Sequence, residues 1–135
     1  MKAFIDTNIF VYAYDRADRR KQRIARTLLA QIEKAGSGVV SLQVQQEFFW
    51  VATRKLNIDP VAAKAILQRW LKFELVLPSQ DLVYDAIDCS ITARISFWDS
   101  LVVVSAERAQ CDLLYSEDMN HEQVVRGVKV VNPFV

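Results

Sequence analysis

The sequence predicts a single α/β domain over residues 1–135, with a mostly parallel sheet of four to five strands flanked by helices. The length of the chain and its 52% hydrophobic content suit one compact core. Gly and Pro occur only three times each, which leaves little sequence for linkers or disordered tails. Short β-prone runs alternate with longer helical segments, as is typical of parallel strands joined by crossover helices.

The predicted strands are short and β-prone. They are expected at Ala3–Ile5, Val39–Ser41, Leu75–Leu77, Leu113–Tyr115 and Lys129–Val131. Segments with helical periodicity separate the first four, so we expect these strands to run parallel. A parallel α/β sheet places its ligand site at the carboxyl ends of the strands. Residues that follow a strand are therefore the first candidates for function.

Five helices are expected between and after these strands. They are predicted at about Arg19–Ala35, Leu42–Leu56, from Pro60 onward, Gln80–Arg94 and Trp98–Ala109. The first carries Ile24, Leu28 and Ile32 at i, i+4 and i+8, and it stops at Gly36. The third begins after Asp59, a residue type that caps helices.

The charge and the cysteines restrict the class of protein. The formal net charge is +1, so nucleic-acid binding would need a local basic patch. Cys89 and Cys111 form no CxxC pair, which argues against a disulfide framework and a zinc site. No apolar run approaches the roughly 20 residues of a membrane span, and Asp6 interrupts any signal peptide. We expect a cytoplasmic protein that does not enter a membrane.

Two acids stand near strand ends. Asp6 directly follows the first predicted strand, and Asp118 lies three residues after Tyr115. Aspartate also caps helices and begins turns, so each residue alone is open to a purely structural interpretation.

Two further acids are expected on helices. Glu47 shares a face with the apolar Val44 and Val51, so we expect it to be buried or aimed into a cleft; the alternative is a helix-edge side chain that reaches solvent. Asp99 precedes the most apolar stretch of the chain, but it also stands three residues after Ser96, the spacing of a capping box.

Together the four acids, Asp6, Glu47, Asp99 and Asp118, predict a catalytic cluster above one edge of the sheet. Clustered carboxylates raise one another's pKa values and require a cation. Oxygen ligands without His or Cys favour Mg²⁺ or Mn²⁺, the ions of phosphodiester chemistry. We therefore expect a metal to bind Asp6, Asp99 and Asp118. The polar neighbours expected to orient these carboxylates are Thr7, Asn8 and Ser116, although Thr7 and Asn8 could equally cap a helix.

Other charged residues are interpreted more simply. Asp81, Asp85 and Asp88 are expected on the solvated side of their helix. The lone His121 is either a general base or an ordinary surface residue.

The densest basic cluster is formed by Arg16, Arg19, Arg20, Lys21, Arg23 and Arg26. It is either a solvated helix start or a phosphate track for RNA. In the second case the RNA contacts are expected from Arg19, Arg20, Lys21 and Arg23.

Four motifs resemble PIN domains, and in particular the VapC toxins of bacterial toxin–antitoxin pairs. They are Phe4–Tyr12 at the opening, Gln46–Phe48 around the helical glutamate, Ile95–Leu101 as the third acidic motif, and Leu114–Phe134 as the ending. The resemblance covers the whole chain in order. Two departures are Ser100, where alanine is commoner, and Glu122, where glycine often stands.

The resemblance implies a Rossmann-like PIN fold and a metal-dependent endoribonuclease that cleaves RNA. It also implies a homodimer and a cognate VapB-like antitoxin. The alternative is a PIN-like RNA-binding or regulatory module without activity, which would be expected to lose one of the acids. A phosphatase of the haloacid-dehalogenase type would need an acid at Asn8, and a receiver domain would need an aspartate within Leu77–Ser79.

Overall fold

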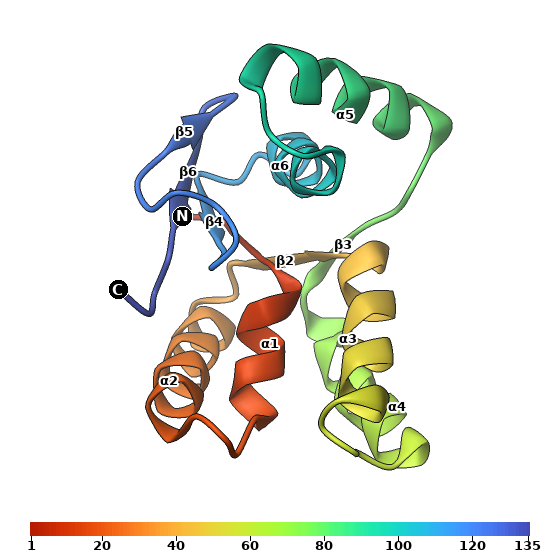
Figure 1. The fold of residues 1–135 in the computed structure, drawn as a ribbon, viewed down its shortest axis with the longest axis vertical. Coiled ribbons are helices and arrows are strands. Elements are labelled where there is room, and N and C mark those ends of the chain that lie inside the picture. The colour runs from red at the N-terminus through yellow and green to blue at the C-terminus, as the bar shows by residue number, and fades with distance from the viewer.

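A six-stranded sheet divides the helices of this protein into two layers. The computed structural model describes all of residues 1–135. Figure 1 shows α5 and α6 on one face of the sheet and α1 to α4 on the other. The predicted α/β class and the helical flanks are therefore confirmed.

The strands follow the order β3-β2-β1-β4-β6-β5 across the sheet. Their bounds are β1 Ala3–Ile5, β2 Gly38–Ser41, β3 Glu74–Val76, β4 Leu113–Tyr115, β5 Val124–Val125 and β6 Val128–Val131. All neighbours are parallel except β5 and β6. The predicted count of four to five strands missed β5. This strand has only two residues, too few to show alternation, and the turn that follows uses positive φ at Arg126 and Gly127.

The central strand β1 controls where the first acid lies. It pairs with β2 on one side and with β4 on the other, and all three of its residues are buried. Residues that follow β1 and β4 are consequently brought side by side at the carboxyl edge of the sheet, although they are far apart in sequence.

The helices agree closely with the predicted segments. Their bounds are α1 Thr7–Tyr14, α2 Arg19–Ala35, α3 Leu42–Arg54, α4 Pro60–Gln68, α5 Gln80–Ala93 and α6 Phe97–Arg108, with a 3-10 turn η1 at Arg69–Lys72. Helix α1 was not among the five expected, because its eight residues are almost all apolar and show no polar face. Asp18 caps α2 by accepting a hydrogen bond from Lys21 N, and Asp59 caps α4.

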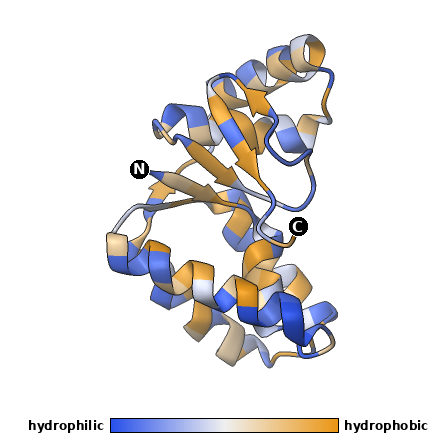
Figure 2. Ribbon diagram, turned by 90° about the vertical axis from the view of Figure 1, so that its left-hand side faces the viewer, coloured by the Kyte–Doolittle hydropathy of each residue, from blue (hydrophilic) through white to orange (hydrophobic).

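The core has an aromatic centre below the sheet. Phe10 of α1 stacks on Trp70 with ring centroids 3.7 Å apart, and Phe48 of α3 packs against the same indole at 4.9 Å. Figure 2 shows the hydrophobic strands between the two helical layers. Cys89 and Cys111 are both buried and free. No helix combines the length and the apolar character needed to cross a membrane.

Candidate active site

Asp6 lies at the corner between β1 and α1 and is only 6% exposed. Its Oδ1 accepts a 2.8 Å hydrogen bond from Thr7 N, so it caps α1. Its Oδ2 accepts a 2.7 Å bond from the hydroxyl of Ser116, which directly follows β4. The same Ser116 Oγ accepts from Asp118 N at 3.1 Å. One serine therefore links the two strand-end acids.

Glu47 joins this corner from α3. Thr7 Oγ1 donates a 2.8 Å hydrogen bond to Glu47 Oε2, and Gln43 Nε2 donates to Oε1 at 2.7 Å. The Glu47 side chain is exposed. Of the alternatives that the sequence left open, burial is therefore wrong; the side chain reaches solvent while it contacts Thr7, the neighbour of Asp6.

Asp99 contributes from the first turn of α6. Ser96 Oγ accepts a 3.0 Å hydrogen bond from Asp99 N, which is the backbone half of the capping-box pattern. The Asp99 carboxylate accepts no hydrogen bond itself and is partly exposed. Burial raises the pKa of Asp118, and the charge of Asp99 adds to this effect. Asp99 therefore lies within electrostatic range of the strand-end acids.

Burial and the charges of neighbouring acids raise the pKa values of Asp6 and Asp118. Burial raises the pKa of Asp6 from 3.8 to about 7, the hydrogen bonds from Ser116 and Thr7 oppose this, and the charges of Asp118 and Glu47 add to it. The pKa of Asp118 is also raised, first by loss of hydration and then by Asp99, Glu117 and Glu47.

Asn8 completes the corner and holds an unused donor. Its Oδ1 accepts a 3.2 Å hydrogen bond from Glu117 N, which ties α1 to the loop after β4. Its Nδ2 is buried and has no hydrogen-bond partner in the protein. The Asn8 side chain also lowers the pKa of Asp118, so the amide and this carboxylate are neighbours without an aligned hydrogen bond. Buried donors normally have a partner, and this one is therefore available to a ligand of the cluster.

The donor set suits a hard divalent cation. The acids offer only oxygen ligands, and both oxygens of Asp6 retain accepting capacity beyond their single hydrogen bonds. Nowhere in the chain do three His, Cys, Asp or Glu side chains already surround one point. The chemistry of the residues fits Mg²⁺ or Mn²⁺, but the side chains do not already form a complete coordination sphere.

Comparison with known proteins identifies the family. The model of the PIN domain matches residues 3–127. The chain belongs to the PIN-domain family. The resemblance noted from the sequence motifs is thereby confirmed at the level of family and fold. Among curated proteins, none shows significant sequence similarity to this PIN domain.

Several solved structures share the fold at low sequence identity. VapC20 of Mycobacterium tuberculosis, a sarcin–ricin loop cleaving toxin, is 19% identical with a TM-score of 0.72, over 88% of this chain and 92% of the toxin. A toxin–antitoxin complex from Klebsiella pneumoniae is also 19% identical, with a TM-score of 0.71 over 98% of each chain. VapBC2 of Rickettsia felis, bound to a DNA fragment from its promoter, is 17% identical with a TM-score of 0.68, over 96% and 97%.

Some side chains of the basic cluster already form hydrogen bonds within this PIN domain. Lys21 Nζ donates to Glu117 Oε2 at 2.6 Å and to the Tyr12 hydroxyl at 3.2 Å. Arg20 Nη2 donates to the Phe134 carbonyl at 2.7 Å. These two side chains tie α2 to the loop after β4 and to the C-terminal segment. Arg19 and Arg23 remain exposed without an acidic partner.

The tentative assignment of Lys21 to RNA stays a prediction. In the structure Lys21 pairs with Glu117, a residue for which the sequence predicted no role. The contact joins residues that are 96 positions apart, and no local pattern in the sequence indicates it.

The charged residues that were not assigned to the acidic cluster from the sequence lie outside it. Asp81 and Asp85 of α5 pair with Arg108, and Asp85 also pairs with Arg126 at 2.7 Å. His121 is exposed, and its Nδ1 accepts a 3.0 Å hydrogen bond from Asn132 N. The neighbouring Glu122 has a φ of 69°, the left-handed conformation that explains why glycine suits this turn.

Proposed function

We propose that this PIN domain is an endoribonuclease that depends on Mg²⁺ or Mn²⁺ and hydrolyses phosphodiester bonds of RNA. The observation that carries the proposal is a buried Asp6, its pKa raised to about 7, within range of Glu47 and Asp118, with Asp99 acting on Asp118. A carboxylate cluster of this kind disfavours its own ionisation, and a divalent cation relieves the repulsion.

Each residue of the cluster receives a role from its contacts. Asp6, Asp99 and Asp118 would hold the ion, and the Ser116 hydroxyl and Thr7 N fix the orientation of Asp6. Glu47 is solvent-accessible and held by Thr7, so it is suited to accept a proton from the attacking water. A bound divalent ion supplies positive charge for the scissile phosphate and acidifies water.

The test is Asp6→Asn, which preserves size but removes the charge. We expect RNA cleavage at saturating Mg²⁺ to fall on the order of a hundredfold or more. Asp88→Asn on α5 is the matched control, because Asp88 is exposed and outside the cluster. If Asp6→Asn cleaved RNA as fast as the parent protein, the assignment would be wrong.

We further propose that the protein is the toxin of a VapBC-type pair and that a VapB-like antitoxin neutralises it in the cytoplasm. The shared fold with toxin–antitoxin complexes supports this proposal. An apolar hollow of about 390 Å³ between α1, α2 and η1 offers a docking surface for an apolar segment. Its hydrophobic walls include Phe10, Tyr14, Leu29, Trp70 and Phe73.

Expression in cells tests the toxin role. The intact chain should arrest growth, Asp6→Asn should not, and co-expression of the neighbouring gene product should relieve the arrest and give a complex that co-purifies. Light scattering of the purified toxin tests the homodimer that we also expect. An intact chain without toxicity and without a co-purifying partner would point to a housekeeping nuclease.

A further inference from the structure

A second hollow, of about 490 Å³, lies at the far end of α1 from the acids. It is formed where the turn between α1 and α2 meets the end of α3 and the turn into α4. Helix α1 has eight residues, so its two ends are about 12 Å apart. We name this hollow the basic pocket; its charged and amide walls come from Asp15, Arg16, Gln22, Arg26 and Lys55.

The charge of the basic pocket is unbalanced. Arg16, Arg26 and Lys55 line it, and none of the three forms a salt bridge in the structure. Asp15 is the one acid, and its Oδ1 accepts a 2.9 Å hydrogen bond from Ala17 N within the turn. Three cations therefore face one carboxylate that is engaged by the backbone.

One of these cations is held in place. Arg26 Nε donates a 2.7 Å hydrogen bond to the carbonyl of Ala13, and the guanidinium carbon lies 5.9 Å from the centre of the Tyr14 ring. The terminal nitrogens of Arg26 make no hydrogen bond within the protein. A guanidinium fixed through Nε presents its two terminal nitrogens to a planar or tetrahedral oxyanion.

An unpaired amide lies beside these cations. Gln22 lines the basic pocket, and its side chain makes no hydrogen bond within the protein. An amide without a protein partner can donate hydrogen bonds to an oxyanion in the pocket. Lys55 at the C-cap of α3 is also explained by the helix dipole, but the dipole does not account for Arg26.

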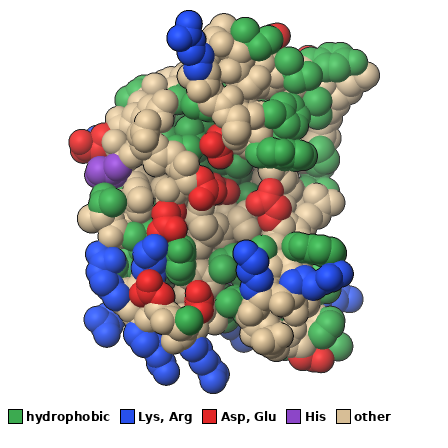
Figure 3. Space-filling view, viewed as in Figure 1, with side chains coloured by type: hydrophobic (Ala, Val, Ile, Leu, Met, Phe, Trp, Pro, Cys, Tyr) green, Lys and Arg blue, Asp and Glu red, His purple; other side chains and the backbone are tan.

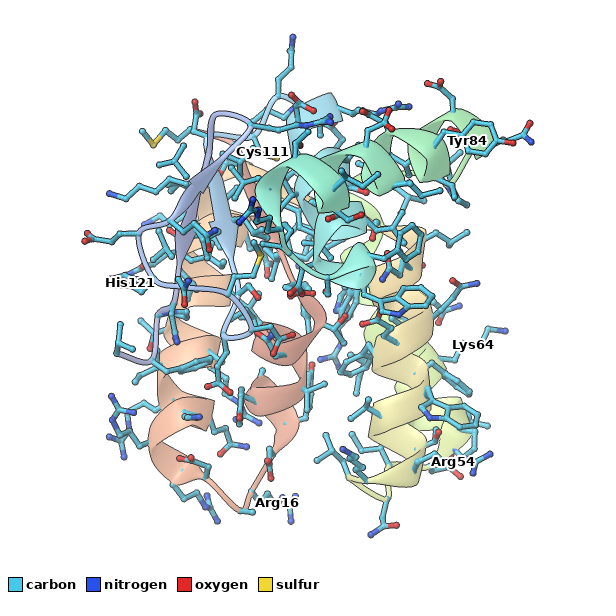
Figure 4. The ribbon with its side chains drawn as sticks, turned by 45° about the horizontal axis from the view of Figure 1, so that its top comes forward. Arg16, Arg54, Lys64, Tyr84, Cys111 and His121 are labelled. Atoms are coloured by element: carbon cyan, nitrogen blue, oxygen red, sulfur yellow. The ribbon has the colours of Figure 1, made fainter.

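The placement of charge over the molecule favours a phosphate of RNA. Figure 3 shows a band of acids across the middle of this face and Lys and Arg gathered below it, toward the end of α1 and α2. Figure 4 places Arg16 at the turn between α1 and α2, at the same end of the molecule as Arg54 of α3. The acidic cluster repels a nucleic acid strand, so affinity has to come from cations outside it.

We propose that the basic pocket binds a backbone phosphate of the RNA, away from the scissile bond, through Arg16, Gln22, Arg26 and Lys55. This proposal rests on the proposed ribonuclease function, and it places the path of the bound RNA along α1. Arg20 and Lys21 form hydrogen bonds within the protein. The proposal therefore moves the expected RNA contacts from these two residues to the residues around Gln22.

The test measures RNA binding without cleavage. Short single-stranded RNA is titrated into Asp6→Asn protein in EDTA at several salt concentrations, and circular dichroism checks the fold. The pocket variant is Arg16→Gln with Lys55→Gln. Its control is Lys34→Gln with Lys64→Gln, which removes the same charge from exposed positions that form no ion pair.

The pocket variant should bind RNA about tenfold more weakly, with a salt slope smaller by roughly 0.7, the value for one phosphate of a single strand. The control should bind like its parent. Gln22→Leu should weaken binding without changing the slope. Addition of inorganic phosphate should shift the NMR signal of the Gln22 side-chain amide.

Several results would overturn the proposal. If RNA binding were weakened equally in the pocket variant and in its control, the protein would attract RNA by its overall charge and not through a defined site. Unchanged RNA affinity in a variant that no longer binds inorganic phosphate would indicate a site for a free anion. Loss of the co-purifying antitoxin with RNA affinity intact would indicate a protein-docking face. If the parent cleaves RNA and the pocket variants bind it normally, this proposal fails alone; if the parent neither binds nor cleaves RNA, the proposed function fails with it.

Discussion

The hydroxyl of Ser116 donates a 2.7 Å hydrogen bond to Oδ2 of Asp6, although the two residues are 110 positions apart in the sequence. This bond lowers the pKa of Asp6 against the effect of burial. The serine thus favours the ionised form that a metal ligand requires.

Ser116→Ala is therefore expected to shift the proposed nuclease activity to higher pH. Without the hydroxyl the pKa of Asp6 rises further, so ionisation of this carboxylate requires a more alkaline solution. Cleavage at neutral pH should fall about tenfold or more, as is usual when the partner of a metal ligand is lost. Ser105→Ala is the control, since its buried hydroxyl bonds only to the Leu101 carbonyl. An unchanged pH profile would show that Ser116 has no influence on Asp6.

The stability of the metal-free protein should decrease as the pH rises toward 7. The pKa of Asp6 is about 7 in the folded state against 3.8 ordinarily, so the folded state retains a proton that the unfolded chain releases. The contribution is fully present below about pH 4 and is lost as the pH rises through 7. Its size is on the order of a few kcal/mol.

Urea unfolding in EDTA at pH 5 and pH 8 measures this effect. Asp6→Asn should show a smaller difference between the two pH values and should be more stable than the parent at pH 8. Added Mg²⁺ should stabilise the parent at pH 8 by mass action and the variant much less. The same pH dependence in both proteins would contradict the prediction.

Lys21→Met should destabilise the fold more than it weakens RNA binding. Lys21 pairs with Glu117 at 2.6 Å, both side chains are about a quarter exposed, and its ammonium lies 4.6 Å from the centre of the Tyr12 ring. Loss of this network should lower the free energy of unfolding by about 1 kcal/mol. Arg23→Met, which removes an exposed and unpaired charge, should leave stability unchanged. A larger loss of RNA affinity for Lys21→Met than for Arg23→Met would contradict this prediction and support Lys21 as an RNA contact.

Gly38→Ala tests how tightly α2 and η1 close over β2. A Cβ atom at this position would lie 2.6 Å from Cδ1 of Phe73 and 3.0 Å from Cγ2 of Ile32. We expect a loss of roughly 1–3 kcal/mol in unfolding experiments, typical of overpacking. Adding Phe73→Leu should recover part of the loss, and a fully stable single variant would show that Phe73 moves aside freely.

The sequence predicted most of the fold because its signals are local. The caps at Asp59 and Ser96, the stop at Gly36 and the alternation of strands and helices all lie within a few residues of what they determine. Helix α1 was missed because it is apolar on nearly every side, and β5 because two residues carry no period.

The candidate site could likewise be predicted only in part from local signals. The four acids could be selected from their positions after strands and on helix faces, whereas the helical periodicity left open whether Glu47 is buried or reaches solvent. Contacts between distant segments had no local signal, and this is why the engagement of Lys21 with Glu117 and the cavity around Gln22 emerged only from the structure.

The central place of β1 has a consequence for the synthesis of this protein. The strand that carries Asp6 is made first, but its neighbour β4 and the residues that complete the corner, Ser116 and Asp118, are made more than a hundred residues later. A chain still emerging from the ribosome therefore lacks half of its acidic corner and the middle of its sheet. The complete acidic site of the proposed nuclease can therefore form only after Asp118 has been synthesised.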